Sequence, residues 1–196
     1  RNGVLAVLLA RAGWTANPAA LEHPAGYVAS FNGDAEVRTA PLTRWGEELE
    51  ILSEYGLALK PYPSCGATHT AIEAAVLLRA EIGDLSRNRR IRAGVSEMHA
   101  RPLIYVEAET GLQGKFSLHY CIAAALVDGA VDLGTFRDAR VRDPRIAALM
   151  PRIAMEVDER VRHDPEFACV LEVELADGTR LERMVPLAMG KPARWF

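Results

Sequence analysis

The stretch Lys60-Pro61-Tyr62-Pro63-Ser64-Cys65-Gly66-Ala67-Thr68-His69 brings a cation, a thiol and an imidazole close together around two prolines. Each proline fixes its own φ and biases the residue before it toward extended conformations, so residues 60–63 are expected to leave a strand as a stiff turn. From Thr70 to Ile82 the apolar periodicity predicts a helix, with Thr68 as its N-cap. Such a strand-to-helix junction points backbone N–H groups and the positive end of a helix dipole at one spot, which suits an anionic substrate.

Downstream of this junction, the sequence predicts a sheet with helices on one of its faces. Alternating apolar and polar residues predict strands over 91–100, continued over 103–107, and over 151–157, 168–175 and 180–186. Helical spacing predicts further helices over 116–126, which stops at Asp128-Gly129, and over 144–150, which starts at Asp143-Pro144. Ala176-Asp177-Gly178-Thr179 predicts a hairpin between the last two strands. The simplest architecture is α+β, with two helices on one face of a mainly antiparallel sheet.

The N-terminal part of the chain is predicted to be helical and separate from this sheet. Residues 1–30 predict helices interrupted at Gly13, Asn17-Pro18 and His23-Pro24. A loop at 32–34 and connecting chain at 41–48 follow, and residues 49–59 are expected to be extended and to deliver Lys60 to the junction. We therefore expect a helical part over 1–47, an α/β part over 48–189 and a short tail over 190–196.

Two features of the chain bear on its compartment. The apolar run from Val4 to Ala10 is only about seven residues long, too short to span a bilayer, and is expected to be a helix buried in a larger domain. The three cysteines, Cys65, Cys121 and Cys169, are an odd number without a CxxC pair, so they indicate neither a disulfide framework nor an iron–sulfur cluster. A reducing cytoplasm is expected, with no membrane association.

Composition and motifs exclude several classes of function. The chain is 49% apolar and 25% charged, as globular proteins are, and its net charge of −3 argues against nonspecific nucleic-acid binding. The short basic run Arg87-Asn88-Arg89-Arg90 is expected to be a solvated loop. His23, His99 and His163 have no partner at metal-ligand spacing, and neither a phosphate-binding glycine loop nor a Gly-x-Ser-x-Gly elbow occurs. We therefore expect no metal and no cofactor.

From the residues alone, the junction has two equally open interpretations. It is a binding site for an anion, or it is structural, with Cys65 acting as a small buried hydrophobe and His69 forming a hydrogen bond within the first helical turn.

A resemblance favours the first interpretation. Lys60 to His69 resembles the Lys-x-[Tyr/Phe/Trp]-Pro-x-[Cys/His] motif of the MmgE/PrpD family, which includes 2-methylcitrate dehydratases, cis-aconitate decarboxylases and iminodisuccinate epimerases. Gly114 to Gly129 is similar to the family's Lys-Phe-Ser-x-x-Tyr-x-x-Ala-x-Ala-Leu-x-x-Gly. Arg1 to Thr15 is similar to its Ala-Ala-Arg-x-Gly … Leu-Ala-x-x-Gly-[Phe/Trp]-Thr helix. These segments occur in the family's order along the chain.

The resemblance also implies an architecture. Family members pair a large helical domain with a small α/β lid domain, and they are longer than this chain. Residues 1–47 then correspond to a remnant of the helical domain, 48–189 to the lid and 190–196 to a truncated tail. The chain is expected to be a C-terminal fragment, without the aspartate and histidines that the family places upstream, and a homodimer is expected.

The chemistry that the resemblance implies is proton abstraction at a carbon next to a carboxylate, without a cofactor, on a small di- or tricarboxylate. Such a site needs cations for the substrate carboxylates, a base near the carbon and an acid near the leaving group. By the resemblance, the catalytic candidates are Lys60, Cys65 and Tyr120. The substrate-binding candidates are His69, Lys115 and Ser117. Tyr120 has an open alternative as a buried helix residue with a locally satisfied hydroxyl, and Ser117 as a helix cap.

Several functions fit these residues. A 2-methylcitrate dehydratase-like lyase is the first choice, and an iminodisuccinate epimerase-like isomerase or a cis-aconitate decarboxylase-like lyase is the alternative. A third hypothesis is an inactive truncated remnant without catalysis.

Overall fold

The structure, a computed structural model, describes residues 2–32, 46–47, 49–53, 56–99 and 101–195. The chain divides into two compact units, Arg1–Leu49 and Glu50–Phe196, and each is described by itself. Most of the predicted loop at 32–34 and of the predicted connecting chain at 41–48 lies outside the described residues, as does Ala100 at the end of a predicted strand. No helix of the described ranges is long and apolar enough to cross a membrane.

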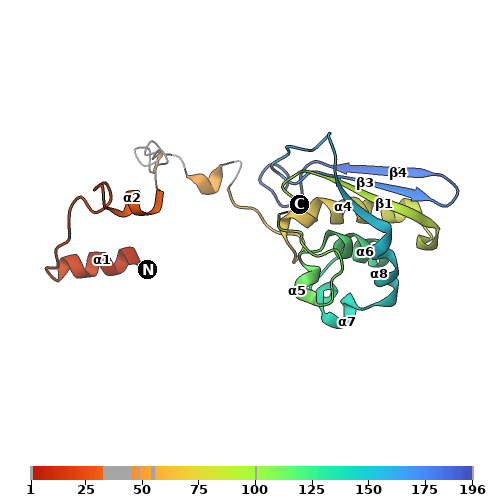
Figure 1. The fold of residues 1–196 in the computed structure, drawn as a ribbon, viewed down its shortest axis with the longest axis horizontal. Helices are drawn as coiled ribbons and strands as arrows, with labels where there is room; N and C mark the ends of the chain where they lie inside the picture. The colour runs from red at the N-terminus through yellow and green to blue at the C-terminus, as the bar shows by residue number, and fades with distance from the viewer. Residues whose placement is uncertain (1, 33–45, 48, 54–55, 100, 196) are drawn as a thin grey trace. The chain divides into compact units, whose positions relative to one another are not determined.

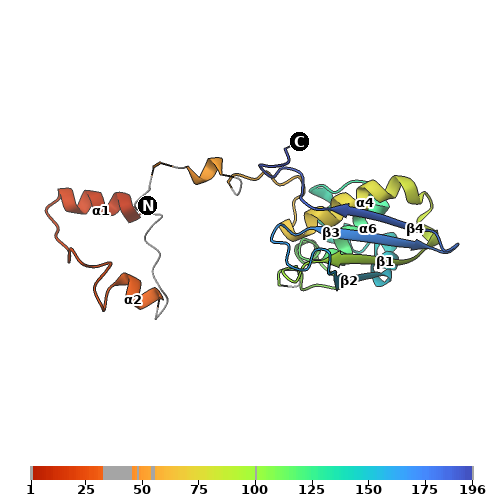
Figure 2. The ribbon, with the colours of Figure 1, turned by 90° about the horizontal axis from the view of Figure 1, so that it is seen from above.

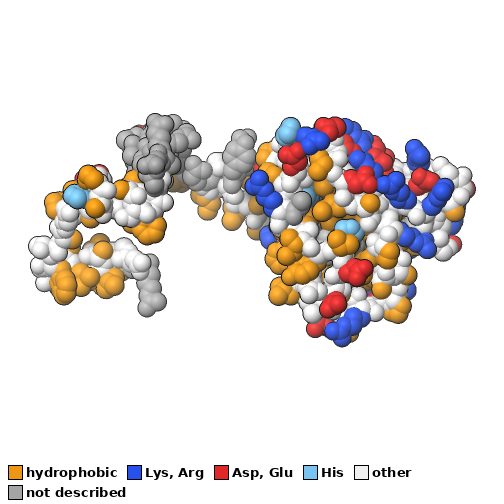
Figure 3. Space-filling model, viewed as in Figure 1, with side chains coloured by type: hydrophobic (Ala, Val, Ile, Leu, Met, Phe, Trp, Pro, Cys, Tyr) orange, Lys and Arg blue, Asp and Glu red, His pale blue; other side chains and the backbone are white. Residues whose placement is uncertain are grey.

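The described residues of the N-terminal unit form two helices, α1 (Asn2–Arg11) and α2 (Tyr27–Asn32). None of the residues of α1 is buried, and Val4 and Val7 each expose at least 60% of their surface. Figure 3 accordingly shows hydrophobic side chains on the surface of this unit. Helix formation is confirmed, whereas burial of α1 in a larger domain stays a prediction.

The second unit is built on a four-stranded sheet, which Figure 2 shows face on. Its strands are β1 (Asn88–Val95), β2 (Ile153–Val157), β3 (Cys169–Leu175) and β4 (Arg180–Val185), in the order β2-β1-β3-β4. The β1–β2 pair is parallel, and the β1–β3 and β3–β4 pairs are antiparallel. The turn between β3 and β4 places Gly178 at φ 85°, a conformation that suits glycine. The predicted α+β fold with a mostly antiparallel sheet is confirmed.

Two long helices, α4 (His69–Ile82) and α6 (Leu118–Asp128), cover one face of this sheet (Figures 1 and 2). Their apolar faces pack with alternate residues of the strands. Fully buried members of this core are Ile72, Leu78, Ile122, Ile91 and Leu171. Burial of each such side chain contributes about 1.5–3 kcal/mol. α6 ends where predicted, because Gly129 takes a left-handed conformation at φ 73°.

Shorter elements complete the unit. The short helices are α5 (Gly111–Gly114), α7 (Asp138–Val141) and α8 (Pro144–Leu149). Single 3-10 turns are η1 (Glu50–Leu52), η2 (Gly66–Thr68), η3 (Leu85–Arg87), η4 (Gly134–Phe136) and η5 (Met150–Arg152). α8 begins as predicted, because the Asp143 carboxylate accepts the Arg145 N–H at 2.9 Å.

Four local predictions are wrong. The strand predicted over 91–100 ends at Val95, because His99 Nδ1 accepts the Ser96 N–H at 3.1 Å and closes a turn. Residues 103–107 form no strand, since Leu103 alone is deeply buried there. The described part of 49–59 contains the 3-10 turn η1 in place of an extended segment. The basic run at 87–90 is not a loop, because Asn88 to Arg90 begin β1 by pairing with β3.

Candidate active site at the start of helix α4

The junction reaches α4 through η2, which gives Thr68 an unexpected role. Thr68 occupies the predicted N-cap position, but its side chain makes no capping hydrogen bond. Its hydroxyl donates to the Cys65 carbonyl at 2.8 Å and lies 2.7 Å from the Ser64 hydroxyl. Because η2 already gives Thr68 a helical conformation, its side chain turns back toward the 60–65 turn and fixes the shape of that turn.

Lys60 and His69 converge on one carbonyl. Lys60 Nζ donates to the Ser64 carbonyl at 3.2 Å, and His69 Nε2 lies 3.4 Å from the same oxygen. A bond from Nε2 to a carbonyl requires the Nε2–H tautomer, which leaves His69 Nδ1 as an acceptor. Lys60 itself is exposed.

His69 is a neutral imidazole at physiological pH. It is only 4% exposed, and burial lowers its pKa to about 4, with the positive charges of Lys60 and Lys191 acting in the same direction. The rings of His69 and Tyr62 form a T-shaped pair with their centroids 5.5 Å apart. In this state the imidazole is a fixed hydrogen-bonding group and only a weak base.

Cys65 links the junction to the segment that starts α6. Its backbone N–H donates to the Lys115 carbonyl at 3.0 Å, so two motifs that are distant in sequence lie side by side. All three cysteines are free, and Cys65 alone among them is partly exposed. Burial raises the pKa of the Cys121 and Cys169 thiols to about 12, so Cys65 is the only one of the three placed to meet a substrate.

Lys115 contacts Cys65 through its backbone, and the side chains of Lys115 and Ser117 both have partners of their own. Lys115 Nζ lies 5.9 Å from the centroid of the Phe136 ring, a cation–π arrangement. Ser117 is fully buried, and its hydroxyl accepts the Tyr120 N–H at 3.1 Å as the N-cap of α6. The structure thus gives Ser117 a capping role, and its contact with substrate stays a prediction.

Tyr120 is a core residue in this structure. It is 0% exposed, and its hydroxyl donates to the Thr135 carbonyl. Burial raises the pKa of the phenol well above its ordinary value. Gly114 packs so closely that a Cβ there would lie 2.9 Å from the ring. This geometry matches the structural alternative for Tyr120, and its catalytic role stays a prediction.

The tail brings two further cations to the junction that the sequence alone does not indicate. The Leu59 N–H donates to the Gly190 carbonyl at 2.8 Å, which ties the tail to the chain just before Lys60. Lys191 lies close enough for its charge to lower the pKa of His69. Arg194 pairs with Glu73 on α4. The sequence signal for this contact is Glu73 itself, a carboxylate among the apolar residues of the first half of α4, which requires a partner when buried.

The cations differ in how they are paired. Arg194 is bound to Glu73, which is 6% exposed, and Lys191 Nζ lies 2.7 Å from Glu166. Lys60, within the described residues, bonds only to a carbonyl. Lys60 and Lys115, which contacts the Phe136 ring, are therefore the two cations at this junction without a carboxylate partner among the described residues, and Lys60 is the more exposed of the two.

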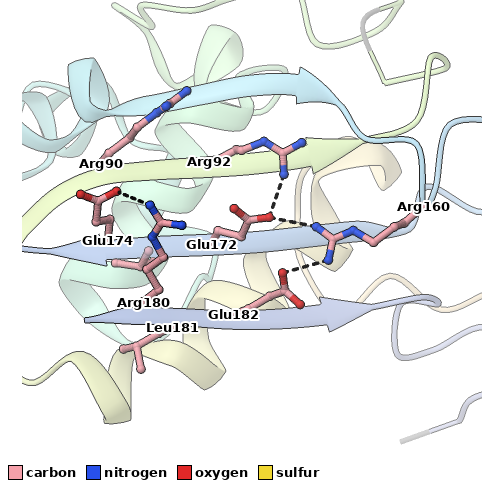
Figure 4. A pocket seen from close by; sticks show the side chains of 9 residues that line it. Arg90, Arg92, Arg160, Glu172, Glu174, Arg180, Leu181 and Glu182 are labelled. Atoms are coloured by element: carbon pink, nitrogen blue, oxygen red, sulfur yellow. Dashed lines mark hydrogen bonds and ion pairs between the residues drawn. The ribbon is translucent and has the colours of Figure 1, made fainter. Parts of the chain in front are cut away.

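A cavity of about 400 Å³ on the open face of the sheet provides a contrast. Figure 4 shows Glu172 held between Arg92 and Arg160, and Glu182 bound by Arg160. Figure 3 likewise shows positive and negative side chains intermingled over the second unit. Because its guanidinium groups already have carboxylate partners, this cavity is a poor site for an anion. The described residues contain no group of three His, Cys, Asp or Glu that could hold a metal ion.

Comparison with known families settles which family the junction belongs to. A sequence model of the MmgE/PrpD C-terminal domain matches residues 62–196, which is most of the chain and all of the site above except Lys60. The chain belongs to the MmgE/PrpD family. The expected family is thereby confirmed from residues that include Cys65, His69 and the tail.

Similar proteins include two kinds of enzyme by name. The 2-methylcitrate dehydratase-like protein oryR of Aspergillus oryzae is 28% identical over 185 residues, covering 86% of this chain and 36% of its own. The cis-aconitate decarboxylases of Mus musculus and Homo sapiens are 22% identical over 193 residues and 23% over 189, each covering 91% of this chain and 37% of its own. This MmgE/PrpD chain therefore spans little more than a third of the length of these relatives.

Proposed function

We propose that this MmgE/PrpD chain contributes the lid side of a lyase that acts on small di- or tricarboxylates by removing a proton next to a carboxylate. A 2-methylcitrate dehydratase-like reaction is the first candidate, which the family and the name of the Aspergillus relative support. The observation that carries the proposal is Lys60, an exposed ammonium on the segment that leads into η2 and α4, without a carboxylate partner among the described residues.

The residues of the junction divide the work. Lys60 binds a substrate carboxylate and stabilises the negative charge that develops when the neighbouring carbon loses its proton. His69, neutral and bound to the Ser64 carbonyl, stabilises the turn that follows Lys60, and its own contact with the substrate stays a prediction. A pKa of about 4 makes His69 too weak a base for this carbon acid. Cys65 borders the same spot, beside Lys115, and stays the candidate of this junction for moving a proton.

A cis-aconitate decarboxylase-like reaction is the second candidate, because two of the relatives carry that name. The same cation serves both reactions, since loss of water and loss of CO₂ both build charge next to a carboxylate. The epimerase-like reaction stays a third alternative, and an inactive remnant is the outcome if none is found. We also propose that the enzyme is a cytoplasmic homodimer that needs no cofactor, on the grounds of the family and the free cysteines.

The test is a substrate panel on the protein that carries this chain. Turnover of 2-methylcitrate is measured by the appearance of a double bond, and turnover of cis-aconitate by the release of CO₂. Turnover of iminodisuccinate is measured by the loss of optical rotation. We expect turnover of 2-methylcitrate and a fall of at least about 100-fold in Lys60→Ala, because the transition state loses a charge contact. Lys115→Ala is the matched control, with a smaller expected loss. No turnover of any of the three compounds would contradict the proposal.

A further inference from the structure

A second cavity, of about 530 Å³, lies at the opposite end of α4 from the candidate active site. Its lining comes from the last turn of α4, the η3 turn, the end of α6, and α8 with η5. α4 has 14 residues and is therefore about 21 Å long, so this cavity is separate from the site at its first turn. The volume falls within the range of small-molecule pockets.

The cavity carries positive charge that is not neutralised. Three arginines line it, and one of them, Arg145, is bound to Asp143 by contacts of 3.2 and 3.0 Å. Arg79 and Arg152, within the described residues, bond only to carbonyl oxygens, those of Gly83 at 2.8 Å and Asn88 at 2.5 Å. A guanidinium has five N–H donors, so each has most of its hydrogen-bonding capacity left for a ligand.

One carboxylate, that of Asp84, also lines the cavity, and its hydrogen bonds are made within the η3 turn. Asp84 accepts the Ser86 N–H at 2.9 Å and the Ser86 hydroxyl at 2.8 Å. It makes no ion pair with Arg79 or Arg152 in the part of the chain that the structure describes. Among the described residues, two guanidinium groups of this lining therefore have no carboxylate partner, whereas every arginine that lines the cavity on the open sheet face has one.

The remaining wall is apolar. Leu85, Val127 and Leu149 line the cavity together with Ala148. A ligand that satisfies both parts of the lining has an anionic head for the guanidinium groups and an aliphatic body for these side chains.

We propose that this cavity binds a small aliphatic carboxylate, with its head on Arg79 and Arg152. The binding is independent of the reaction proposed above. Such a ligand would join the end of α4 to the η5 turn that leads into β2, and it would stabilise the folded unit by mass action.

The test is a titration of the nitrogen-15-labelled chain with hexanoate, followed by amide chemical shifts. Acetate lacks the aliphatic body, and 1-hexanol lacks the charge. We expect hexanoate to shift the amides of Gly83, Ser86 and Val127, and to bind at least about tenfold more tightly than either control, because both parts of the cavity contribute. Shifts centred on residues 60–69, or no binding, would overturn the proposal.

Variants separate the cavity from general charge effects. In the double variant Arg79→Gln, Arg152→Gln, hexanoate affinity is expected to fall at least about tenfold. Ala148→Trp, which fills the cavity and keeps both charges, is expected to abolish binding. Because the two variants act by different means, a folding defect in one of them leaves the other as a valid test. Arg180→Gln and Lys60→Gln are the controls and should bind hexanoate normally. Binding that survives both cavity variants, or that is lost in Lys60→Gln, would contradict the proposal.

Discussion

The start of α4 and the open face of the sheet both carry several charged side chains, but they use them differently. On the sheet, Arg92 donates to Asp158 at 2.9 Å and to Glu172 at 2.8 Å, so its charge is neutralised by carboxylates of the fold. At the junction, Lys60 contacts only a carbonyl among the described residues and is exposed. Pairing therefore distinguishes a cation that stabilises the fold from one that is kept for a ligand.

The largest effect on stability is expected where a buried carboxylate loses its cation. Arg194→Met leaves the buried Glu73 carboxylate without its cation, and because the Arg194 side chain is 39% exposed, the cost is about 2–3 kcal/mol in the free energy of unfolding. Urea unfolding monitored by circular dichroism measures the loss. The matched control is the double variant Arg194→Met, Glu73→Met, which removes both charges and should recover much of the stability. Equal losses in the two variants would show that the pairing is unimportant.

Tyr120→Phe tests whether the core and the site are distinct. The variant leaves the Thr135 carbonyl without its donor, so the free energy of unfolding is expected to fall by about 1–3 kcal/mol. Turnover per folded molecule should hardly change, because the hydroxyl is fully buried. Stability is measured by urea unfolding and turnover by the substrate panel. A large fall in turnover at unchanged stability would show instead that the Tyr120 hydroxyl takes part in catalysis.

The pH dependence of stability tests the environment of His69. Its pKa is lowered to about 4 in the folded state, below the ordinary 6.5, so below about pH 6.5 the unfolded state binds more protons. The resulting stability is full above pH 6.5 and is lost as the pH falls toward 4. His99, also with a pKa lowered to about 4 by burial, behaves in the same way within the core.

His69→Gln and His99→Gln should each reduce the slope of stability against pH between 6.5 and 4, measured by urea unfolding at successive pH values. Lys60→Met should leave most of that slope, because burial is the larger cause of the low pKa of His69. An unchanged slope in His69→Gln would show that the imidazole is protonated or solvated in the folded protein.

The smallest effect is expected at the rim of the sheet face. Arg180 is 82% exposed and lies 3.8 Å from Glu174. An exposed, loose ion pair contributes little, so Arg180→Gln should leave both melting temperature and turnover unchanged. A marked fall in melting temperature, followed by differential scanning calorimetry, would mean that the charges of this face act as one network.

Sequence patterns predicted the elements that local chemistry determines. Asp143-Pro144, Asp128-Gly129 and Asp177-Gly178 each mark an end or a turn that the structure contains. The patterns failed where distant partners decide: Asn88 to Arg90 become a strand because β3 pairs with them, and residues 103–107 lack a strand partner.

The candidate site divides in the same way. The Lys60 to His69 motif is local, and its residues do meet at one carbonyl. Lys191 and Arg194 reach the junction only because the tail folds back onto the chain before Lys60, a contact between segments far apart in sequence. The hydrogen bond from the Tyr120 hydroxyl to the Thr135 carbonyl is also a tertiary contact. The sequence therefore left open whether Tyr120 is a catalytic residue or a core residue.

The most direct test of the central claim compares Lys60→Met with Arg92→Met in the protein that carries this chain, measuring melting temperature and turnover of 2-methylcitrate on the same samples. The account predicts that Lys60→Met keeps its melting temperature and loses turnover at least about 100-fold, whereas Arg92→Met melts earlier and keeps its turnover per folded molecule. A Lys60→Met protein that melts earlier and turns over normally would contradict it, and Lys60 would then be a structural residue.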